Sequence, residues 1–192
     1  MKFTVIILAG GKSSRMGTDK GLVLMNEIPM IERVIKTVKK AGLSEIIIVS
    51  NNTEYKQFGL PVFPDVIPDK GPLGGIYTGL LKSSTVKNLI LSCDVPFINE
   101  TVLKLLIRNG LKSKVTIVKY ENRIHNLIGI YDNSLIKDLG EHLISNKLKV
   151  GQFIEAHNPN VIDLKIFMPD LDEQILSNVN TMEELKKLEY GM

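Results

Sequence analysis

In the stretch Leu8-Ala9-Gly10-Gly11-Lys12-Ser13-Ser14-Arg15-Met16-Gly17-Thr18-Asp19-Lys20, an apolar run opens into two glycines, and three cations follow. The apolar run, Phe3–Ala9, has the length and composition of a buried strand. Glycines at the end of such a strand let the backbone approach a ligand closely, and their N–H groups can point at phosphate oxygens. The cations Lys12, Arg15 and Lys20 add the charge that a polyphosphate requires. The stretch therefore predicts a strand that ends in a phosphate-binding loop.

This loop fits neither of the two common phosphate-binding motifs. A Walker A motif ending in Gly11-Lys12-Ser13 would need a glycine where Ile6 stands, and no G-x-G-x-x-G pattern can be read here. We therefore expect a loop of a third kind, which binds a nucleotide whose phosphates are cleaved.

Composition and charge indicate a single domain. The 192 residues, 44% of them hydrophobic, can form one domain spanning residues 1–192. The net charge of +3 is small and the basic residues are scattered, so neither a nucleic acid nor a membrane is an expected partner. The single cysteine, Cys93, excludes a disulfide and a cysteine metal cluster. Neither a signal peptide nor an apolar run of membrane-spanning length is present, so a cytoplasmic location is expected.

Strand-like and helix-like segments alternate along the chain. Runs rich in Ile, Val and Leu predict strands at Phe3–Ala9, Glu45–Ser50, Asn88–Ser92, Lys114–Lys119, His125–Tyr131 and Val161–Leu164. Helical patterns cover Pro29–Ala41, Leu73–Lys82, Glu100–Asn109, Ser134–Ile144 and Thr181–Glu189. The alternation predicts a Rossmann-like, three-layer α/β/α fold with a mostly parallel sheet. Ligands of such sheets bind beyond the carboxyl ends of the strands, where Gly10 and Asp94 would lie together.

Asp94 follows an apolar strand and precedes Val95-Pro96, so it is expected at the ligand crevice. A carboxylate beside a phosphate-binding loop is repelled unless a cation lies between them. Mg²⁺ binds one or two protein carboxylates and completes its shell with phosphate oxygens and water. Taken alone, Asp94 is better explained as a helix cap near Asn99 or as a turn aspartate. Together with the glycine loop, it predicts a Mg²⁺ site.

Two further segments are candidates for the same crevice. Asp65 precedes Gly71-Pro72-Leu73-Gly74-Gly75, whose glycines allow close packing against a flat ligand or against the first loop. A turn followed by a helix cap explains this segment as well. In Asn178-Val179-Asn180-Thr181, the threonine and Glu184 form a predicted capping box. The two asparagines are then free to bind across the crevice.

The remaining polar residues supply no evident general base or metal cluster. His125 precedes an apolar strand, His142 and His157 lack metal-ligand spacing, and Cys93 lies on a strand expected to be buried. Phosphoryl-type chemistry depends mainly on positioning and charge. A phosphate nucleophile is already ionised at neutral pH and needs no base. The sequence therefore favours nucleotidyl transfer to a phosphomonoester, with pyrophosphate leaving, over a kinase that acts on an alcohol.

These motifs together resemble the molybdenum cofactor guanylyltransferases over nearly the whole chain. The matching residues, in order, are Leu8-Ala9-Gly10-Gly11, Arg15-Met16-Gly17, Asp19-Lys20, Gly71-Pro72-Leu73-Gly74-Gly75, Cys93-Asp94-Val95-Pro96 and Asn178-Val179-Asn180-Thr181. The first motif alone indicates the wider nucleotidyltransferase superfamily, with its nucleotide-diphospho-sugar transferase-like fold. The final N-V-N-T narrows the resemblance to this family.

The resemblance implies transfer of GMP from GTP to molybdenum-molybdopterin, with Mg²⁺ as cofactor and pyrophosphate as product. Its implied protein partners are molybdopterin-synthesis proteins and apo-molybdoenzymes. By matched position, the nucleotide-binding residues are Leu8, Ala9, Gly10, Gly11, Lys20, Asn51, Asp65, Gly71, Gly74 and Asp94. Arg15, Lys20 and Asp94 are the implied catalytic residues, and Asp94 holds the metal. The chain departs from the family at His125-Asn126, where a His-Pro or Gln-Pro pair is usual.

Two alternatives remain open at this level. One is a cytidylyltransferase acting on the same cofactor or on another small phosphate, because the residues alone do not select the base. The other is a non-catalytic module that binds nucleotide and delivers cofactor to partner enzymes. Such a module would be expected to lack a cation or the metal ligand, whereas Arg15, Lys20 and Asp94 are all present.

Overall fold

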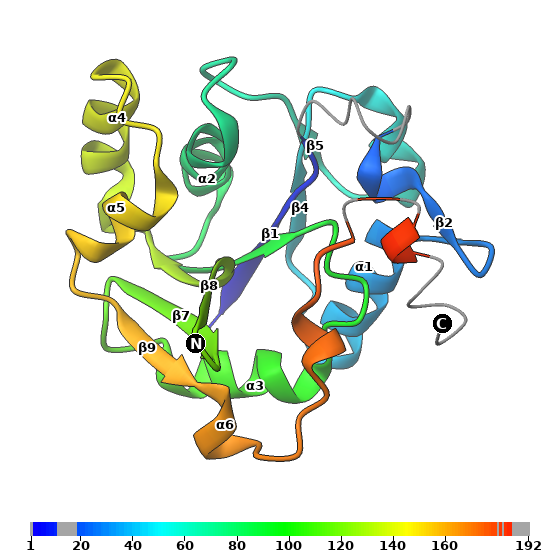
Figure 1. Cartoon of the computed structure of the whole chain (residues 1–192). Coiled ribbons are helices and arrows are strands. Elements are labelled where there is room, and N and C mark those ends of the chain that lie inside the picture. Colours follow the sequence, from blue (N-terminus) through cyan, green and yellow to red (C-terminus); the bar gives the residue numbers. More distant parts are fainter. Residues whose placement is uncertain (1, 11–18, 180, 182, 186–192) are drawn as a thin grey trace.

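The structure is a computed structural model that describes residues 2–10, 19–179, 181 and 183–185. Helices cover both faces of a central sheet, as Figure 1 shows. Within the described residues, this sheet has seven strands in the spatial order β5-β4-β1-β6-β8-β7-β9. The strands are β1 (Phe3–Leu8), β4 (Ile46–Val49), β5 (Val62–Phe63), β6 (Lys87–Ser92), β7 (Val115–Tyr120), β8 (Arg123–Asp132) and β9 (Asn160–Asp163).

The sheet is mostly parallel, as predicted. Strand β8 pairs antiparallel with both of its neighbours, β6 and β7, while the other pairings in this sheet are parallel. The chain goes from β1 to β4 and β5 on one side and then crosses to β6 on the other. The carboxyl ends of β1 and β6 therefore meet where the strand order reverses, which is the ligand-binding point of open α/β sheets.

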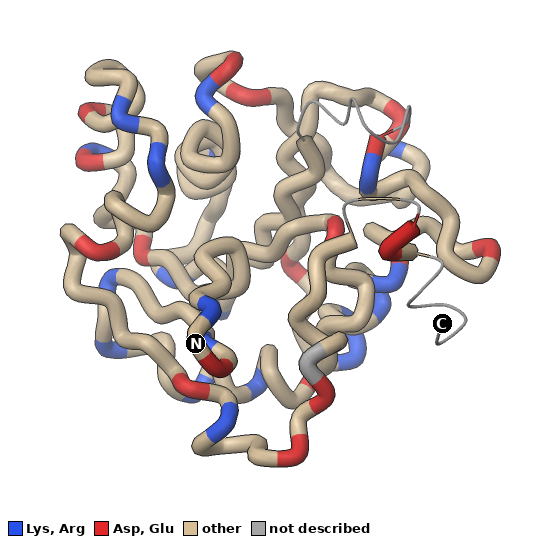
Figure 2. Tube along the Cα trace, viewed as in Figure 1, with Lys and Arg blue, Asp and Glu red and all other residues tan. Residues whose placement is uncertain are grey.

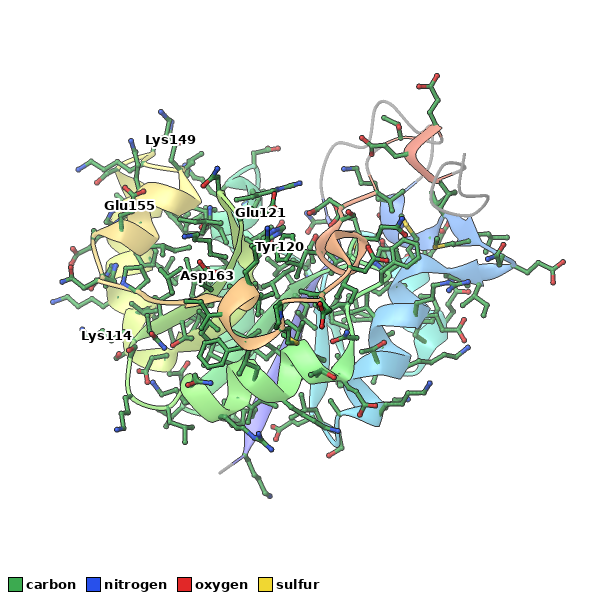
Figure 3. All side chains as sticks on the ribbon, turned by 60° about the horizontal axis from the view of Figure 1, so that its bottom comes forward. Lys114, Tyr120, Glu121, Lys149, Glu155 and Asp163 are labelled. Carbon is green, nitrogen blue, oxygen red and sulfur yellow. The ribbon has the colours of Figure 1, made fainter. Side chains whose placement is uncertain are left out.

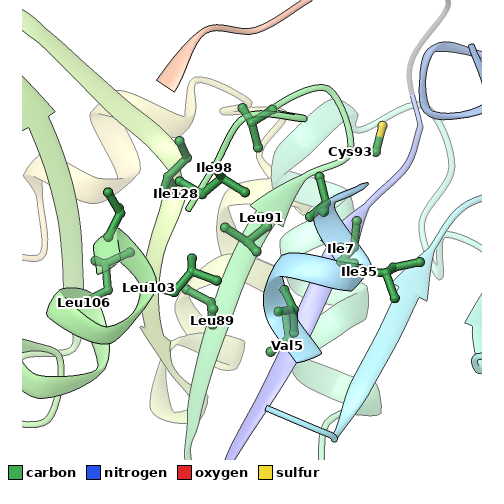
Figure 4. Packing of buried hydrophobic residues seen from close by; sticks show 14 of the residues in the cluster. Val5, Ile7, Ile35, Leu89, Leu91, Cys93, Ile98, Leu103, Leu106 and Ile128 are labelled. Carbon is green, nitrogen blue, oxygen red and sulfur yellow. The ribbon is translucent and has the colours of Figure 1, made fainter. Parts of the chain in front are cut away.

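Alternate residues of the buried strands face opposite layers. Val5 and Ile7 pack against helices α1 (Met30–Lys40) and α3 (Glu100–Asn109). Figure 4 shows this layer, in which Ile35 and Leu103 lie close to the strand side chains. Ile6 and Leu8 pack against the helices of the other face, which are α2 (Gly71–Lys82), α4 (Ile136–Ile144) and α5 (Val150–Glu155). The predicted three-layer α/β/α arrangement is therefore confirmed.

Helix α2 approaches β1 so closely that Gly79 has no room for a side chain. A Cβ atom on Gly79 would lie 2.4 Å from Cγ2 of Ile6. We expect Gly79→Ala to lower the free energy of unfolding by about 1–3 kcal/mol through overpacking. Gly140→Ala in α4 is the matched control, because its Cβ would meet Tyr77 at an ordinary 3.6 Å and alanine favours a helix. Urea unfolding of both variants checks this, and equal stabilities would contradict it.

Up to residue 179, the long predicted elements are confirmed to within a few residues, but several short ones were missed. Most of the predicted helix Thr181–Glu189 lies outside the described residues. Leu164 begins helix α6 (Leu164–Phe167) instead of ending a strand, because the Asp163 side chain accepts the N–H of Lys165 and caps the helix. The hairpin β2 (Leu24–Met25) and β3 (Ile28–Pro29) turns through Asn26 and Glu27, both at positive φ. Glutamate is not a usual residue for such a turn, so no sequence signal marked it.

Other missed elements are the 3₁₀ turns η1 (Lys20–Leu22), η2 (Thr53–Phe58), η3 (Asn133–Leu135) and η4 (Glu173–Leu176), and strand β5 and helix α5. Near the end of the chain, the predicted capping box is confirmed. Thr181 Oγ1 accepts the Glu184 N–H at 3.0 Å, and a Glu184 carboxylate oxygen accepts the Thr181 N–H at 3.2 Å.

Candidate functional site

The carboxyl ends of β1 and β6 place the predicted loop and the predicted acid side by side. Cys93 donates its N–H to the Leu8 carbonyl at 3.0 Å, and Ala9 donates its N–H to Val49 at 2.9 Å. Gly10 is the first exposed residue beyond this ladder, and a Cβ there would meet no atom within 4 Å. The backbone at Gly10 is therefore open to a ligand. Leu8 and Ala9 are buried, so any contact they make with a nucleotide runs through their backbone.

Asp94 is a buried carboxylate held by two donors. Its Oδ1 accepts the Ser92 hydroxyl at 2.6 Å and the Asn178 side-chain amide at 2.8 Å. The N–H of Val179 also binds the Asp94 carbonyl at 2.9 Å, so the C-terminal segment is tied to this strand exit. In Figure 1 this orange-red segment runs beside the green loop that follows β6. The expectation that Asn178 binds across the crevice is confirmed.

Lys20 lies opposite this carboxylate. Its Nζ is 3.7 Å from Asp94 Oδ2, and the two side chains are 30% and 11% exposed. The distance is long for a tight salt bridge, and the exposure leaves the ammonium accessible to a substrate. The two residues therefore present a cation and a carboxylate to the same small region, as predicted from the sequence.

Asp19 fixes the turn that carries Lys20. Its Oδ1 accepts the Gly21 N–H at 3.4 Å and the hydroxyl of fully buried Tyr55, and Asn52 binds its Oδ2 at 3.4 Å. Gly21 packs so closely that a Cβ there would lie 2.5 Å from the Tyr55 hydroxyl oxygen. The sequence patterns missed Tyr55, because a tyrosine in a short 3₁₀ turn gives no signal of a contact 36 residues away.

Asn51 and Asp65 are brought together at the end of β4. Asn51 donates its amide to Asp65 Oδ2 at 3.2 Å, and its Oδ1 accepts the Asp65 N–H at 3.0 Å. Partial burial raises the pKa of the Asp65 carboxyl, and the hydrogen bond from Asn51 opposes that rise. The two predicted nucleotide-binding residues thus form one paired unit.

The glycines at the start of α2 have different surroundings. Gly71 is exposed and has a φ of +60°. A Cβ on Gly74 would lie 2.8 Å from Cβ of Lys70, and one on Gly75 would lie 3.2 Å from the Leu8 side chain. Gly75 therefore allows close packing against Leu8 of the first strand, whereas the sequence suggested packing against a flat ligand or the first loop. The neighbours of Gly74 come from the loop before the helix.

Some predicted site residues cannot be placed. Gly11, Lys12, Arg15 and Asn180 lie outside the described residues. Cys93 is described and is buried in the core cluster, as expected. Burial raises the pKa of its thiol, which makes it a poor nucleophile.

The residues at the site fit a magnesium ion bound together with a nucleotide. Among the described residues, no group of three or more His, Cys, Asp or Glu side chains could hold a metal ion by itself. Asp94 supplies one carboxylate, with Ser92 and Asn178 both bonded to a single oxygen of it. A metal held by one protein carboxylate needs phosphate oxygens and water for its other positions, which is the usual shell of Mg²⁺ at nucleotides.

A pocket opens next to Asp94, between β8 and the C-terminal segment. Ser92 and Asn178, the two residues bonded to Asp94, form part of its wall, and Arg123, His125 and Asn126 of β8 form another part. Burial, with a smaller effect from the charge of Arg123, lowers the pKa of His125 to about 4. The imidazole is therefore neutral at physiological pH.

The lowered pKa of His125 predicts a pH-dependent stability. The unfolded chain, with a histidine pKa near 6.5, gains a proton between pH 6.5 and 4, while the folded chain stays neutral over most of that range. The contribution of His125 to the stability of the fold is therefore fully present above the unfolded pKa of about 6.5, and it is lost as the pH falls towards 4. By this linkage, the free energy of unfolding of the wild type falls by about 2 kcal/mol more between about pH 7.5 and pH 5 than that of His125→Asn does. Urea unfolding at the two pH values measures it, and equal losses would refute the shift.

Lys20 faces Asp94 at the switch point of a mostly parallel sheet, which is where open α/β folds bind their ligands. Residues 5–161 match the family model described as MobA-like NTP transferase domain. The chain therefore belongs to that family. Nucleotidyltransferases of this kind generally depend on a divalent metal.

Individual relatives agree with this assignment. A protein from Carboxydothermus hydrogenoformans is 37% identical over 186 residues, which cover 96% of this chain and 94% of its own. A Haemophilus influenzae protein named molybdenum cofactor guanylyltransferase is 35% identical, with 96% of both chains covered. Molybdopterin-guanine dinucleotide biosynthesis protein A from Archaeoglobus fulgidus has the same fold, with a TM-score of 0.80, 22% identity and 97% of both chains covered. Among the helices of the described residues, none is long and apolar enough to cross a membrane.

Proposed function

We propose that this protein transfers GMP from GTP to the terminal phosphate of molybdenum-molybdopterin, giving the molybdopterin guanine dinucleotide cofactor and pyrophosphate. The observation that carries the proposal is the pairing of Lys20 with Asp94 at the meeting point of β1 and β6. The names of the relatives support guanine as the base and molybdopterin as the acceptor.

In the proposed reaction, an oxygen of the acceptor phosphate attacks the α-phosphorus of GTP. A new P–O–P linkage forms, the bond to the β-phosphate breaks, and pyrophosphate leaves with the bonding electrons. The phosphate nucleophile is already ionised, so no side chain has to remove a proton. His125, with a pKa of about 4, is a weak base and fits this scheme.

We assign Asp94 to the binding of Mg²⁺ together with the phosphates. When bound, Mg²⁺ neutralises phosphate charge and orients the triphosphate. Lys20 places a positive charge at the same phosphates, and Arg15 is proposed to meet the charge that develops during transfer. Ser92 and Asn178 hold the carboxylate of Asp94 in place.

The nucleotide is proposed to lie along the ends of β1 and β4. Backbone groups of Leu8, Ala9, Gly10 and Gly11 would contact the nucleotide. Gly71 and Gly74, at the start of α2, would contact it as well. The pair of Asn51 and Asp65 would bind the base. A carboxylate can accept a hydrogen bond from an exocyclic amino group, which guanine, adenine and cytosine carry and uracil lacks. The choice of guanine among the three is therefore supported by the names of the relatives.

The substrates proposed here are small molecules rather than nucleic acid. Figure 2 shows Lys and Arg interspersed with Asp and Glu along the trace. We propose further that residues 1–192 act as one nucleotidyltransferase domain in the cytoplasm. Molybdopterin-synthesis proteins and apo-molybdoenzymes are its proposed protein partners, because such a cofactor has to be received and passed on.

A nucleotide-selectivity assay tests the function. The protein is incubated with Mg²⁺, molybdenum-molybdopterin and each of the four ribonucleoside triphosphates, and released pyrophosphate is measured. We expect release with GTP, and none in a control without acceptor. Reaction with CTP or UTP but not GTP would indicate the cytidylyltransferase or a related enzyme. Tight GTP binding without pyrophosphate would indicate the non-catalytic module.

A further inference from the structure

We propose that Tyr55 is a positioning residue for the transfer reaction, and that its hydroxyl acts on Lys20 through the carboxylate of Asp19. This inference rests on the proposed function and goes beyond it, because it gives a part in the reaction to a fully buried side chain from the turn that follows β4. Three features carry it: the long ion pair of Lys20, the bonding of Asp19, and the tight fit of Gly21.

The ion pair across the site constrains Lys20 only weakly. Its Nζ lies 3.7 Å from Asp94 Oδ2, which is too long for a hydrogen bond, and its side chain is 30% exposed. The placement of the lysine backbone therefore matters for where the ammonium meets the phosphates. This backbone belongs to η1, a 3₁₀ turn of three residues. Such short turns have poor hydrogen-bond geometry of their own, so contacts from outside have to hold them.

The outside contacts reach η1 through Asp19, which caps it. The Asp19 Oδ1 atom accepts the Gly21 N–H at 3.4 Å, a long bond for a cap. The same oxygen accepts the Tyr55 hydroxyl, and Asn52 donates its amide to Oδ2 at 3.4 Å. Burial raises the pKa of Tyr55, so its hydroxyl stays protonated and remains a donor. Both oxygens of the capping carboxylate are thus fixed by the segment that follows β4.

Tyr55 is itself held in place. Its ring is fully buried in the core cluster beneath α1. The turn η2 that carries it is closed at both ends. Asn52 Oδ1 accepts the Glu54 N–H at 3.0 Å at the start, and Gly59 ends the turn with a φ of +67°. The hydroxyl is therefore a fixed point against which Asp19 is placed.

The packing of Gly21 shows how closely the lysine turn is fitted. A Cβ on this buried glycine would lie 2.5 Å from the Tyr55 hydroxyl oxygen and 3.1 Å from Sγ of Cys93. Cys93 directly precedes Asp94 in the chain. The residue after Lys20 thus lies between the side chain that holds Asp19 and the residue before the proposed metal ligand. A change at the Tyr55 hydroxyl reaches the turn through this packing as well as through the hydrogen bond.

A double-mutant cycle of Tyr55→Phe and Lys20→Met tests the inference. Phenylalanine keeps the buried ring and removes only the hydroxyl. We expect Tyr55→Phe to lower kcat by about 10- to 100-fold at saturating GTP and acceptor, since a misplacement of about 1 Å can cost about a hundredfold. In the Lys20→Met background, the same substitution should change kcat by less than about twofold, because its effect passes through the lysine.

Tyr120→Phe is the matched control. Its hydroxyl also donates to another part of the chain, the Leu171 carbonyl, at 3.0 Å. Tyr120 ends β7, which is two strands away from β6 in the sheet, and it lies beside Glu121 (Figure 3). We expect its kcat to match that of the parent protein in both backgrounds. Thermal unfolding of each variant shows that it is folded at the temperature of the assay.

A second measurement separates this inference from the proposed function. The Kd for inorganic triphosphate is measured on the same proteins without acceptor. We expect Tyr55→Phe to raise it by about 3- to 10-fold when Lys20 is present and not in Lys20→Met. If GTP gives no pyrophosphate but this pattern holds, guanylyl transfer is wrong and the positioning role stands. If GTP reacts and Tyr55→Phe leaves kcat unchanged, or lowers it equally in both backgrounds, the positioning role is overturned and the function stands.

Discussion

Replacing Asp94 with asparagine reduces Mg²⁺-dependent pyrophosphate release by about a thousandfold or more. The substitution keeps the size of the side chain and an oxygen that can still accept from Ser92 and Asn178. It removes the negative charge that would hold the metal. Because the loss falls on the metal rather than on the fold, we expect GTP binding measured without Mg²⁺ to remain.

The control for this variant is Asp138→Asn. Asp138 is also a carboxylate in an ion pair, with His157 at 3.0 Å, but it lies on α4, away from the strand ends. We expect its turnover to match wild type. A rise in the Mg²⁺ concentration needed for half-maximal rate should accompany any residual activity of Asp94→Asn. Unchanged turnover in Asp94→Asn would remove this residue from the metal-binding role.

Replacing Lys20 with methionine lowers kcat by about 100- to 1,000-fold, because a charge that meets the phosphates in the transition state is lost. Methionine is unbranched and one atom shorter than lysine, so it keeps most of the apolar part of the side chain while it removes the charge. The KM for GTP also rises if Lys20 contacts the ground-state triphosphate. Steady-state kinetics with varied GTP at saturating acceptor separate the two effects.

Lys36→Met serves as the matched control for the lysine. Lys36 is half exposed and pairs with Glu32 on α1 at 2.8 Å, so it loses an ion pair without touching the site. Lys20→Arg keeps the charge and should retain more activity than Lys20→Met. Equal rates for Lys20→Met and Lys36→Met would show that the ammonium does not act in the reaction.

Sequence patterns predicted the parts of this molecule that local rules control. The run from Phe3 to Ala9 has the length and the β-branched composition of a buried strand, and Asp94 follows shortly after a second such strand. Because neighbouring parallel strands end at the same edge of a sheet, the residues that follow β1 and β6 lie close together. The capping box at Thr181 does not involve Asn178, and the Asn178 amide binds Asp94.

The parts that sequence patterns missed depend on contacts between distant residues. The reversed strand β8 and its bulge are shaped by Tyr131 and by the tight fit of Gly129 against the backbone of β7. Tyr55 reaches Asp19 across 36 residues. A strand of two residues such as β5 is too short to show the alternation of apolar and polar residues that marks a strand. The roles of Arg15 and Gly11 stay predictions.

The bond between Asn178 and Asp94 joins residues 84 positions apart, and this has a consequence for synthesis of the chain. A domain generally folds as a unit. Asp94 can therefore gain its second hydrogen-bond donor only after residue 178 has been synthesised and has folded against the end of β6. A chain that ends before residue 178 would contain strands β1, β4 and β6 but would lack one of the two hydrogen bonds that hold this carboxylate.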